Sequence, residues 1–312
     1  MVRSILVFLF LSVPAFASYD IEVLVNGSTE LRTEANQLTS LNVTYVHKET
    51  GMKPHHYMKM HDKTNHMIIV SDDLEHFAHV HPTFRHMKKD FVIDLNVETA
   101  PDPDNLDTVG TIPYAGKYLA FTEVMPHTEE MMMAMNRFSI EATGKKRPAV
   151  REYKSISEPG EKLVKYYNND GREEGFGAKY RATFDYELHQ WCSWFLPKFY
   201  VLIEVWDSES KSYKKPEELQ RWLGMGGHSI LISRAELLKD RSFYHLHALL
   251  PVAIPGEYVF PYHDHKKGMD DGDYRIFMQF KHDDKVRKVF FDFEYENPPL
   301  PEFAPLKAPG FC

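Results

Sequence analysis

The sequence has few cysteines, no long apolar run and no excess of positive charge, and each of these shortages excludes a class of protein. Two cysteines among 312 residues are too few for a disulfide-stapled scaffold or for a zinc motif built on several cysteines. No segment after the N-terminal region approaches the roughly 18 consecutive apolar residues of a transmembrane helix, so we expect no membrane span in the mature chain. The formal net charge of −8 argues against nucleic acid or an anionic membrane surface as a partner.

Residues 1–17 are typical of a secretory signal peptide. Arg3 provides a positive start, Ile5 to Val13 form a short apolar run, and an Ala-x-Ala cleavage site ends at Ala17. The run is much shorter than the ~20 apolar residues that cross a bilayer. We therefore expect cleavage after residue 17 and a secreted, periplasmic protein.

The rest of the chain predicts an all-β fold. Short runs of β-branched and aromatic residues, separated by Gly, Pro, Asn and Asp, recur through 18–142 and again through 179–297. The polar segment 143–178 has few apolar periods and is interpreted as a connector. We predict two tandem immunoglobulin-like β-sandwich domains, 18–142 and 179–297, joined by this connector and followed by the Pro-rich tail 298–312.

The two cysteines allow one intramolecular bridge. In an oxidising compartment Cys312, at the end of the Pro-rich tail, could reach back to Cys192. Two unpaired thiols or an intermolecular bond fit the sequence equally well, because spacing alone does not establish proximity.

Three motifs recur in the same order in both halves, which indicates an internal duplication. The run His66-Met-Ile-Ile-Val-Ser71 matches His228-Ser-Ile-Leu-Ile-Ser233, at an offset of 162 residues. A His-x-His pair follows each run, at an offset of 166. A Gly-x-Tyr sequence then opens a later strand in each half, at Gly116 and at Gly272.

The repeated histidines can meet if each run pairs with the His-x-His segment in a hairpin. Such a hairpin opposes His66 to His81 and Ile68 to His79, and directly opposed residues share one face of a sheet. The second half opposes His228 to His247 and Ile230 to His245 in the same way. Imidazoles placed like this can converge on one ion at ~2.0 Å per nitrogen. The sequence therefore predicts two three-histidine metal sites, listed by residue: His66, His79 and His81; His228, His245 and His247.

Methionines near these histidines favour copper, because thioether sulfur suits Cu(I) whereas imidazole suits several metals. Four methionines lie close to the first triad in sequence, and one precedes the second: Met58, Met60, Met67, Met87 and Met225. Zinc remains compatible with the same imidazoles. The competing interpretation is that the histidines hydrogen-bond one another or the backbone and only brace their strands.

These motifs resemble a group of secreted bacterial proteins with YtkA-like, immunoglobulin-like β-sandwich domains. The resemblance rests on several stretches, which are His61 to Leu74, His79-Val80-His81-Pro82, Gly116-Lys-Tyr118, Leu219 to His228, Phe243 to His247, and Gly272 to Phe280. It implies the sandwich fold and adds His61 to the first site. It implies metal handling only by analogy with sandwich-type copper carriers of the periplasm. The second half departs from the pattern, since Ala248 follows its His-x-His pair instead of proline.

Three functions follow from these patterns. The first is a periplasmic metal-binding protein, with copper as the expected ion, that serves binding, buffering or transfer and meets an envelope protein partner. The second is a structural or interaction module of the cell envelope. The third, a metal-dependent enzyme, is favoured least, because motifs such as His-Glu-x-x-His and Gly-x-Ser-x-Gly are absent from the sequence.

Histidine is also unevenly distributed along the chain. Nine of the 17 histidines lie between residues 47 and 86, where a uniform scatter would place about two. Only three of the nine have a geometric reason to meet, and His61 is added by resemblance. The remaining five have no place in these hypotheses: His47, His55, His56, His76 and His86.

Overall fold

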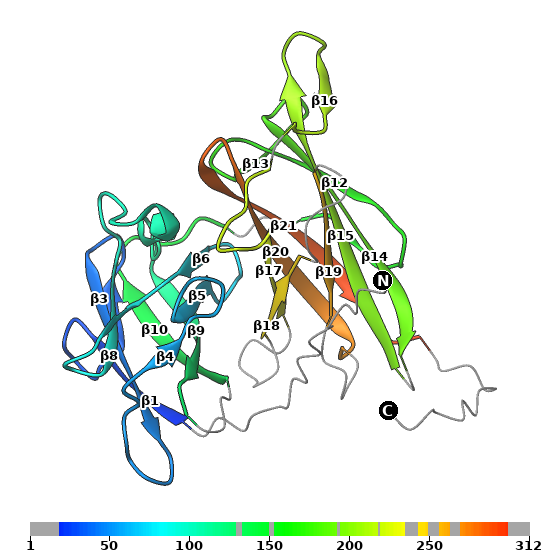
Figure 1. Cartoon of the computed structure of the whole chain (residues 1–312). Helices are drawn as coiled ribbons and strands as arrows, with labels where there is room; N and C mark the ends of the chain where they lie inside the picture. Colours follow the sequence, from blue (N-terminus) through cyan, green and yellow to red (C-terminus); the bar gives the residue numbers. More distant parts are fainter. Residues whose placement is uncertain are drawn as a thin grey trace, which may run out of the picture.

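The computed structural model describes residues 19–128, 133–149, 153–191, 194–217, 219–234, 243–248, 256–262 and 269–298. These residues form β-strands in several sheets, so the all-β prediction is confirmed (Figure 1). Among them, the single helical element is the short 3-10 helix η1 (Pro103–Thr108). The described residues therefore contain no helical membrane span. The expected signal peptide, Cys192 and Cys312 lie outside the described residues, so cleavage and the disulfide stay predictions.

The first half of the chain forms two sheets that enclose a core. One sheet has the order β1-β3-β8-β7, and the other has the order β2-β10-β9-β5-β6, with β4 paired to β9. The strands are β1 (Tyr19–Val25), β2 (Arg32–Glu34), β3 (Thr39–His47), β4 (Tyr57–Met58), β5 (Asn65–Ser71), β6 (Phe77–Val80), β7 (Thr83–Arg85), β8 (Asp90–Leu95), β9 (Gly116–Pro126) and β10 (Ala134–Thr143). Alternating residues such as Leu41, Val43 and Phe91 fill the space between the sheets.

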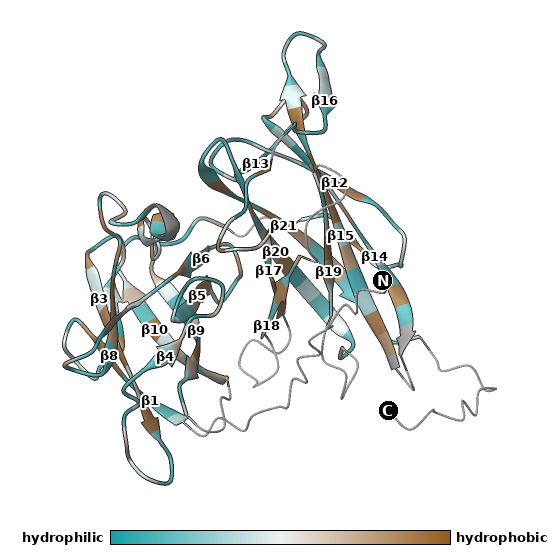
Figure 2. Ribbon diagram, in the orientation of Figure 1, coloured by the Kyte–Doolittle hydropathy of each residue, from teal (hydrophilic) through white to brown (hydrophobic). Residues whose placement is uncertain are grey.

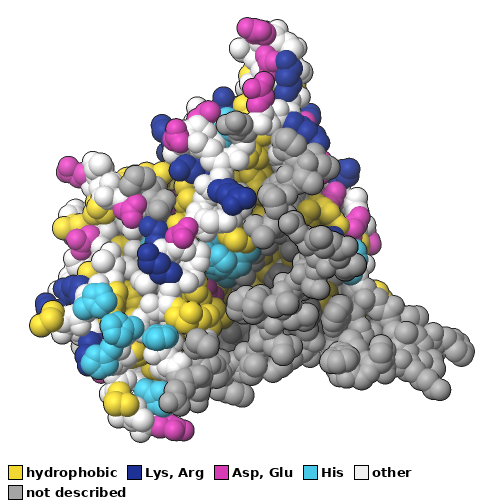
Figure 3. Space-filling model, in the orientation of Figure 1, with side chains coloured by type: hydrophobic (Ala, Val, Ile, Leu, Met, Phe, Trp, Pro, Cys, Tyr) yellow, Lys and Arg dark blue, Asp and Glu magenta, His cyan; other side chains and the backbone are white. Residues whose placement is uncertain are grey.

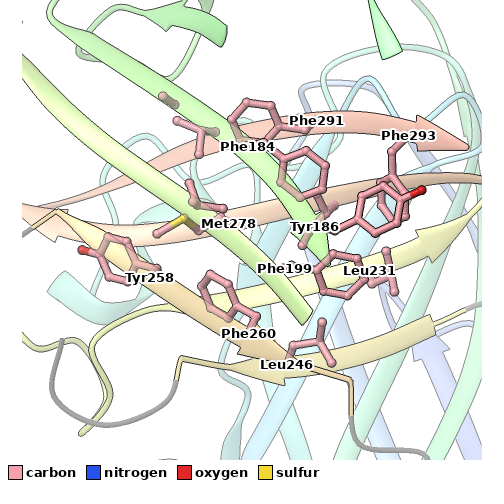
Figure 4. Packing of buried hydrophobic residues seen from close by; sticks show 14 of the residues in the cluster. Phe184, Tyr186, Phe199, Leu231, Leu246, Tyr258, Phe260, Met278, Phe291 and Phe293 are labelled. Atoms are coloured by element: carbon pink, nitrogen blue, oxygen red, sulfur yellow. The ribbon is translucent and has the colours of Figure 1, made fainter. Parts of the chain in front are cut away.

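The second half also forms two sheets around a core, and its histidine-bearing sheet has the same strand order as that of the first half, whereas in its other sheet β15 lies between β14 and β19. Its sheets have the orders β11-β21-β20-β17-β18 and β13-β12-β14-β15-β16, with β19 paired to β15. The strands after residue 179 are β14 (Tyr180–Trp191), β15 (Trp194–Asp207), β16 (Ser212–Lys214), β17 (His228–Ser233), β18 (Phe243–His247), β19 (Glu257–Pro261), β20 (Gly272–His282) and β21 (Lys285–Tyr295). Aromatic rings dominate its core, where Phe184 stacks on Phe291 at 5.0 Å between ring centroids (Figure 4).

Part of the segment that was expected to be a connector, 143–178, instead belongs to the second half. It contributes β11 (Ser155–Ile156), β12 (Leu163–Tyr167) and β13 (Glu173–Glu174). Leu163 and Tyr167 point into the core, and Lys165 lies between them. Because lysine is usually exposed, the buried Lys165 hides the alternation of buried and less buried residues in this strand from a reading of the sequence. Its ammonium group is buried against the Phe290 ring, at 4.3 Å from the centroid.

The tyrosines of the repeated Gly-x-Tyr motifs play the same part in both halves. The Tyr118 hydroxyl donates a hydrogen bond to the carbonyl oxygen of Tyr114 at 3.0 Å, and the Tyr274 hydroxyl donates to that of Asp270 at 2.7 Å. Both bonds span four residues backward along the chain, as in the tyrosine corner of β-sandwiches. The repeat found in the sequence therefore extends to local structure.

The two halves contact each other through one sheet face from each. β5 and β17 are buried along their whole length, because one face of each strand meets its own core and the other face meets the opposite half. The second face carries Ile68 and Val70 in the first half and Ile230 and Ile232 in the second. Figure 2 shows the apolar residues along these strands, and Figure 1 shows β17 and β18 beside β5, β6 and β9.

Two stacked aromatic pairs show that this contact is nearly symmetric. Phe77 stacks on Phe277 at 4.5 Å and 13°, and Phe121 stacks on Phe243 at 4.6 Å and 10°. In the duplication, Phe77 corresponds to Phe243 and Phe121 corresponds to Phe277. Each pair is therefore the image of the other under an exchange of the two halves.

A candidate metal centre between the two halves

The hairpins that position the histidines have the register expected from the sequence. In the first half β5 pairs with β6 so that Ile68 opposes His79. In the second half β17 pairs with β18 so that His228 opposes His247 and Ile230 opposes His245. Each triad offers three ring nitrogens within 4.8 Å of one another, so the structure brings together all six predicted histidines as two groups of three.

The first triad is fully buried and its rings are close. His66 and His79 are each 1% exposed and His81 is 4% exposed. The Nδ1 atom of His66 lies 3.1 Å from the Nε2 atom of His79. The His81 ring lies 4.7 Å from the ring of His79 and 5.0 Å from that of His66, measured between centroids. The three imidazoles therefore surround one small volume.

The outer ring nitrogens of His66 and His79 are both committed as hydrogen-bond donors. Nε2 of His66 lies 2.7 Å from the Met60 carbonyl oxygen, which can only accept. Nδ1 of His79 lies 2.9 Å from Oε1 of Gln279, which belongs to the other half. With the outer nitrogens protonated, the inner nitrogens of the neutral rings carry lone pairs. Two lone pairs then face each other at 3.1 Å, an arrangement that favours a cation between them.

The orientation of the Gln279 amide is fixed by Asp107 of η1. The Gln279 amide nitrogen donates to Oδ2 of Asp107 at 3.2 Å, so its oxygen is the atom that faces His79. Asp107 also accepts from the His79 backbone N–H at 2.9 Å and from Lys288 Nζ at 2.8 Å. This chain of bonds determines the tautomer of His79 from outside the triad.

The same short helix covers the exposed edge of β6. The Asn105 side chain accepts from the His81 backbone N–H at 2.7 Å and donates to its carbonyl oxygen at 3.2 Å. Together with Asp107, it satisfies backbone groups that an edge strand otherwise leaves to solvent. The His-x-His strand is thereby fixed on both edges, by β5 and by η1.

The second triad has the same plan with different outer partners. The Nδ1 atom of His228 lies 3.4 Å from the Nε2 atom of His245. Nδ1 of His245 lies 2.9 Å from Oε2 of Glu123, a carboxylate from the first half. Nε2 of His228 is buried and has no hydrogen-bond partner among the described residues. The tautomer of His228 is therefore less constrained than that of His66.

Burial favours the neutral form of four of the six triad histidines. It lowers the pKa of His66 and lowers the pKa of three other triad histidines well below the usual value: His79, His228 and His245. Burial also raises the pKa of Glu123 to about 7, although His66 and His61 nearby act in the opposite direction. Neutral imidazoles with available lone pairs are the form that binds a metal.

His61 lies between the two triads. It lies in a tight turn with a φ of 47°, beside the bridge between Met60 and Lys63. Its ring is 6.2 Å from that of His66 but only 4.0 Å from that of His247. The resemblance assigned His61 to the first site, whereas the structure places it closer to the second. In the duplication its position corresponds to Leu223, in the matching turn between Trp222 and Met225.

The methionines give less support to copper than the sequence suggested. Met67 points into the first core, on the face of β5 opposite to His66, because side chains alternate along a strand. Met87 is 97% exposed. Met60 contributes its carbonyl oxygen to His66.

The five remaining clustered histidines lie outside the triads. His47 packs against Tyr19, and His76 packs against Tyr114. The other three, His55, His56 and His86, are exposed. Figure 3 shows histidine side chains gathered on this surface of the first half.

Sequence reasoning missed Glu123, Gln279 and Asp107. Glu123 lies on β9, directly opposite His66 of the neighbouring strand β5. Gln279 lies on β20, directly opposite His228 of β17. Both are buried polar residues, at 4% and 2% exposure. A buried charge in the run from Tyr118 to Val124 was the available signal, but the pairing of β9 with β5 was needed to place it beside the histidines.

Comparisons with known proteins report one family match, to a domain of unknown function, DUF8832, over residues 203–297. No curated protein matches. Among solved structures, a Parabacteroides merdae β-glucuronidase is 6% identical, with 88% of this chain and 24% of that chain covered and a TM-score of 0.19. This chain thus spans about a quarter of the length of that enzyme.

Two further structures are similarly distant. The Enterococcus faecalis MSCRAMM ACE, which binds its ligands by the collagen Hug model, is 10% identical with coverages of 91% and 97% and a TM-score of 0.14. Zebrafish RET cadherin-like domains 1 to 4 are 7% identical, with coverages of 85% and 84% and a TM-score of 0.12. Likenesses this weak carry no argument about function.

Proposed function

We propose that this protein is a secreted, periplasmic copper-binding protein whose strand-borne histidine triads bind the ion for buffering or transfer. One observation carries the proposal. The inner nitrogens of His66 and His79 face each other at 3.1 Å while their outer nitrogens are held as donors by Met60 and Gln279. Such outer partners fix the tautomer and orientation of metal-binding histidines in proteins.

The spacing of the ring nitrogens fits a bound ion. Two imidazole nitrogens that each lie ~2.0–2.1 Å from one metal, at a tetrahedral angle, are separated by about 3.3 Å. The 3.1 Å between His66 Nδ1 and His79 Nε2 is close to this value. Little rearrangement is then needed on binding, and the entropy of ordering the ligands is already offset by folding.

Copper is favoured over zinc by ligand chemistry. Imidazole binds both, but the affinity of a nitrogen site for divalent ions is highest for copper in the Irving–Williams order.

The N-terminal features of the sequence support export to the periplasm. A mature protein that begins at Ser18, identified by mass spectrometry of the periplasmic fraction, is the expected result.

Metal analysis of untagged protein tests the proposal. After loading with Cu(II) and gel filtration, elemental analysis should find at least one tightly bound copper per chain. The His79→Ala/His81→Ala variant should lose the copper of the first triad. The matched control is His55→Ala/His56→Ala/His86→Ala, which removes exposed histidines and should keep all tightly bound copper. If wild-type protein retains no copper, or the surface variant loses as much as the triad variant, the proposal is wrong.

A bracing role for the histidines is the second candidate, and one observation favours it. His79 and His245 each bond a residue of the opposite half, Gln279 and Glu123. If bracing is their function, metal-free His79→Ala protein should unfold at much lower denaturant concentration than wild type. If copper binding is their function, the variant should lose copper while its metal-free stability changes little.

A further inference from the structure

We infer that the two triads form a single dinuclear copper centre shared by both halves of the chain, rather than two separate mononuclear sites. This inference rests on the proposed function and extends it. Neither half contains the whole centre, because each half supplies one triad and also the residue that orients a histidine of the other triad.

The spacing of the rings supports one cluster. Within the triads, ring centroids lie between 4.5 Å (His245 to His247) and 5.6 Å (His228 to His245) apart. Between the triads, three ring pairs lie at 5.6–5.8 Å, which are His66–His245, His79–His245 and His79–His228. Rings of different triads are therefore about as close as rings of the same triad. Two ions bound by these rings would be near neighbours, with no layer of protein between them.

The outer hydrogen bonds cross between the halves in a reciprocal pattern. Gln279 of the second half bonds His79 of the first, and Glu123 of the first half bonds His245 of the second. Glu123 and Gln279 occupy equivalent positions, each opposite the first histidine of its own triad. A metal in either triad therefore requires the two halves to be docked, and filling one triad helps to hold the partners that orient the other.

A seventh histidine, His61, lies close to rings of both triads. His61 belongs to the first half, yet its ring lies 4.0 Å from His247 and 5.7 Å from His228. It is only partly buried, in contrast to His66 and His79. His61 of the first half would thus add a ligand to the copper ion at the second triad, so that one half completes the coordination sphere formed by the other.

Electron paramagnetic resonance of the copper-loaded full chain provides the main test. We expect two Cu(II) ions per chain and a spectrum that is broadened by spin coupling, or whose integrated intensity falls well below two spins. The His245→Ala/His247→Ala variant should bind one copper and give the sharp spectrum of an isolated ion. The His79→Ala/His81→Ala variant should behave in the same way.

The outcomes separate this inference from the proposed function. Two coppers in wild-type protein, with sharp lines and an integrated intensity of two spins, would overturn the shared centre and leave copper binding intact. One copper per wild-type chain would do the same. No bound copper in wild type would overturn both. Because the wild-type spectrum alone decides between coupled and isolated ions, the test stands even if a variant fails to fold.

The crossed hydrogen bonds give an independent test. In the His245→Ala/His247→Ala background, which keeps only the first triad, Gln279→Ala should weaken copper binding by about 10–100-fold although Gln279 lies in the second half. Gln220→Ala is the matched control, since Gln220 is in the same half and bonds Asp284 at the surface. Equal affinities for the Gln279→Ala and Gln220→Ala proteins, with unchanged metal-free stability, would contradict the crossed arrangement.

Discussion

The first and second histidine triads share one hairpin plan but differ in how tightly their rings are constrained. The first is fully buried, has an inner nitrogen separation of 3.1 Å, and has outer donors fixed by Met60 and Gln279. In the second, the separation is 3.4 Å, and Nε2 of His228 has no hydrogen-bond partner in the described part of the chain. The repeated strands thus reproduce the ligand positions, whereas the rigidity of each site depends on contacts outside the repeat.

The outer partners differ in charge as well. An amide orients His79, whereas a carboxyl group orients His245, and because burial raises the pKa of Glu123 to about 7, this carboxyl group is mostly ionised only above neutral pH. A carboxylate partner raises the basicity of a metal-binding imidazole more than a neutral amide does. The first triad is therefore the more preorganised site, and the second contains the stronger single donor when Glu123 is ionised.

The largest effect should come from breaking the symmetric packing that brings the triads together. Phe277→Ala removes the ring that stacks on Phe77, and Phe243→Ala removes the equivalent ring that stacks on Phe121. Each should lower the free energy of unfolding by about 3–5 kcal/mol, because each empties a buried aromatic site. Chemical denaturation of metal-free protein measures both. Phe176→Ala, at a ring that is 72% exposed, is the control and should cost far less. If Phe277→Ala and Phe243→Ala lower the free energy of unfolding by clearly different amounts, the two stacked pairs do not contribute equally to stability.

Each bound copper ion should stabilise the protein by a comparable amount. Free copper at 1,000 times its dissociation constant adds about 4 kcal/mol per independent site to the free energy of unfolding, because it binds only the folded chain. Thermal melts with and without copper, and after removal by a chelator, measure the gain. The variant that keeps only the first triad should retain more of it than the variant that keeps only the second. The reverse order would contradict the view that the first triad is better preorganised.

A smaller effect is expected from the turn that closes the first hairpin. Burial alone would raise the pKa of Asp73, but hydrogen bonds from Ser71 and Glu75 and the ion pair with Arg147 hold it below its usual value. A carboxyl group whose pKa is lower in the folded state stabilises the fold above its unfolded pKa of about 3.9, and this contribution disappears as the pH falls. Asp73→Asn should therefore cost about 2 kcal/mol at pH 7.

The pH profile provides the check on this turn. Wild-type stability should fall towards the Asp73→Asn value as the pH drops below about 4. Denaturation midpoints of both proteins between pH 7 and pH 3 would show the two curves converge. A constant gap between them across this range would argue against the ion pair as the source of the stability.

The smallest expected change tests the charge difference between the outer partners. Glu123→Gln keeps an oxygen that can accept from His245 but removes the negative charge that Glu123 carries above its pKa of about 7, so the comparison is made at pH 8. In a His79→Ala/His81→Ala background, copper affinity of the second triad should fall about tenfold, at the lower end of the effect of outer partners. Competition against a chelator of known affinity measures it. An unchanged affinity would mean that the charge of the outer partner does not affect copper binding.

The positions of the histidines could be predicted from the sequence because they depend only on residues close together along the chain. Strand alternation and one hairpin register place His66, His79 and His81 on one face, and the pairing of β5 with β6 confirms that register. The same alternation places Met67 on the other face, so proximity in sequence was a poor guide to its role. Lys165 concealed a strand for a related reason, because a buried ammonium group over aromatic rings looks polar in the sequence.

The meeting of the two triads could not be predicted in this way. It depends on apolar residues such as Ile68 and Ile230, which in the sequence look like members of an ordinary core. It also depends on β9 and β20, whose pairing with β5 and β17 no short loop dictates. Glu123 and Gln279 reach the histidines of the opposite half only through this packing, which is a property of the whole fold.

The stacked pairs Phe77–Phe277 and Phe121–Phe243 are equivalent when the two halves are exchanged. The contact between the halves therefore has the form of an isologous dimer interface, although both halves belong to one chain. In a homodimer of single sandwiches, the residue opposite the first histidine would have to be the same in both subunits. Once two copies are fused, each position evolves alone, so that a carboxylate can stand at 123 and an amide at 279. Fusion would thus turn two identical sites on a symmetry axis into a pair with separate chemical properties.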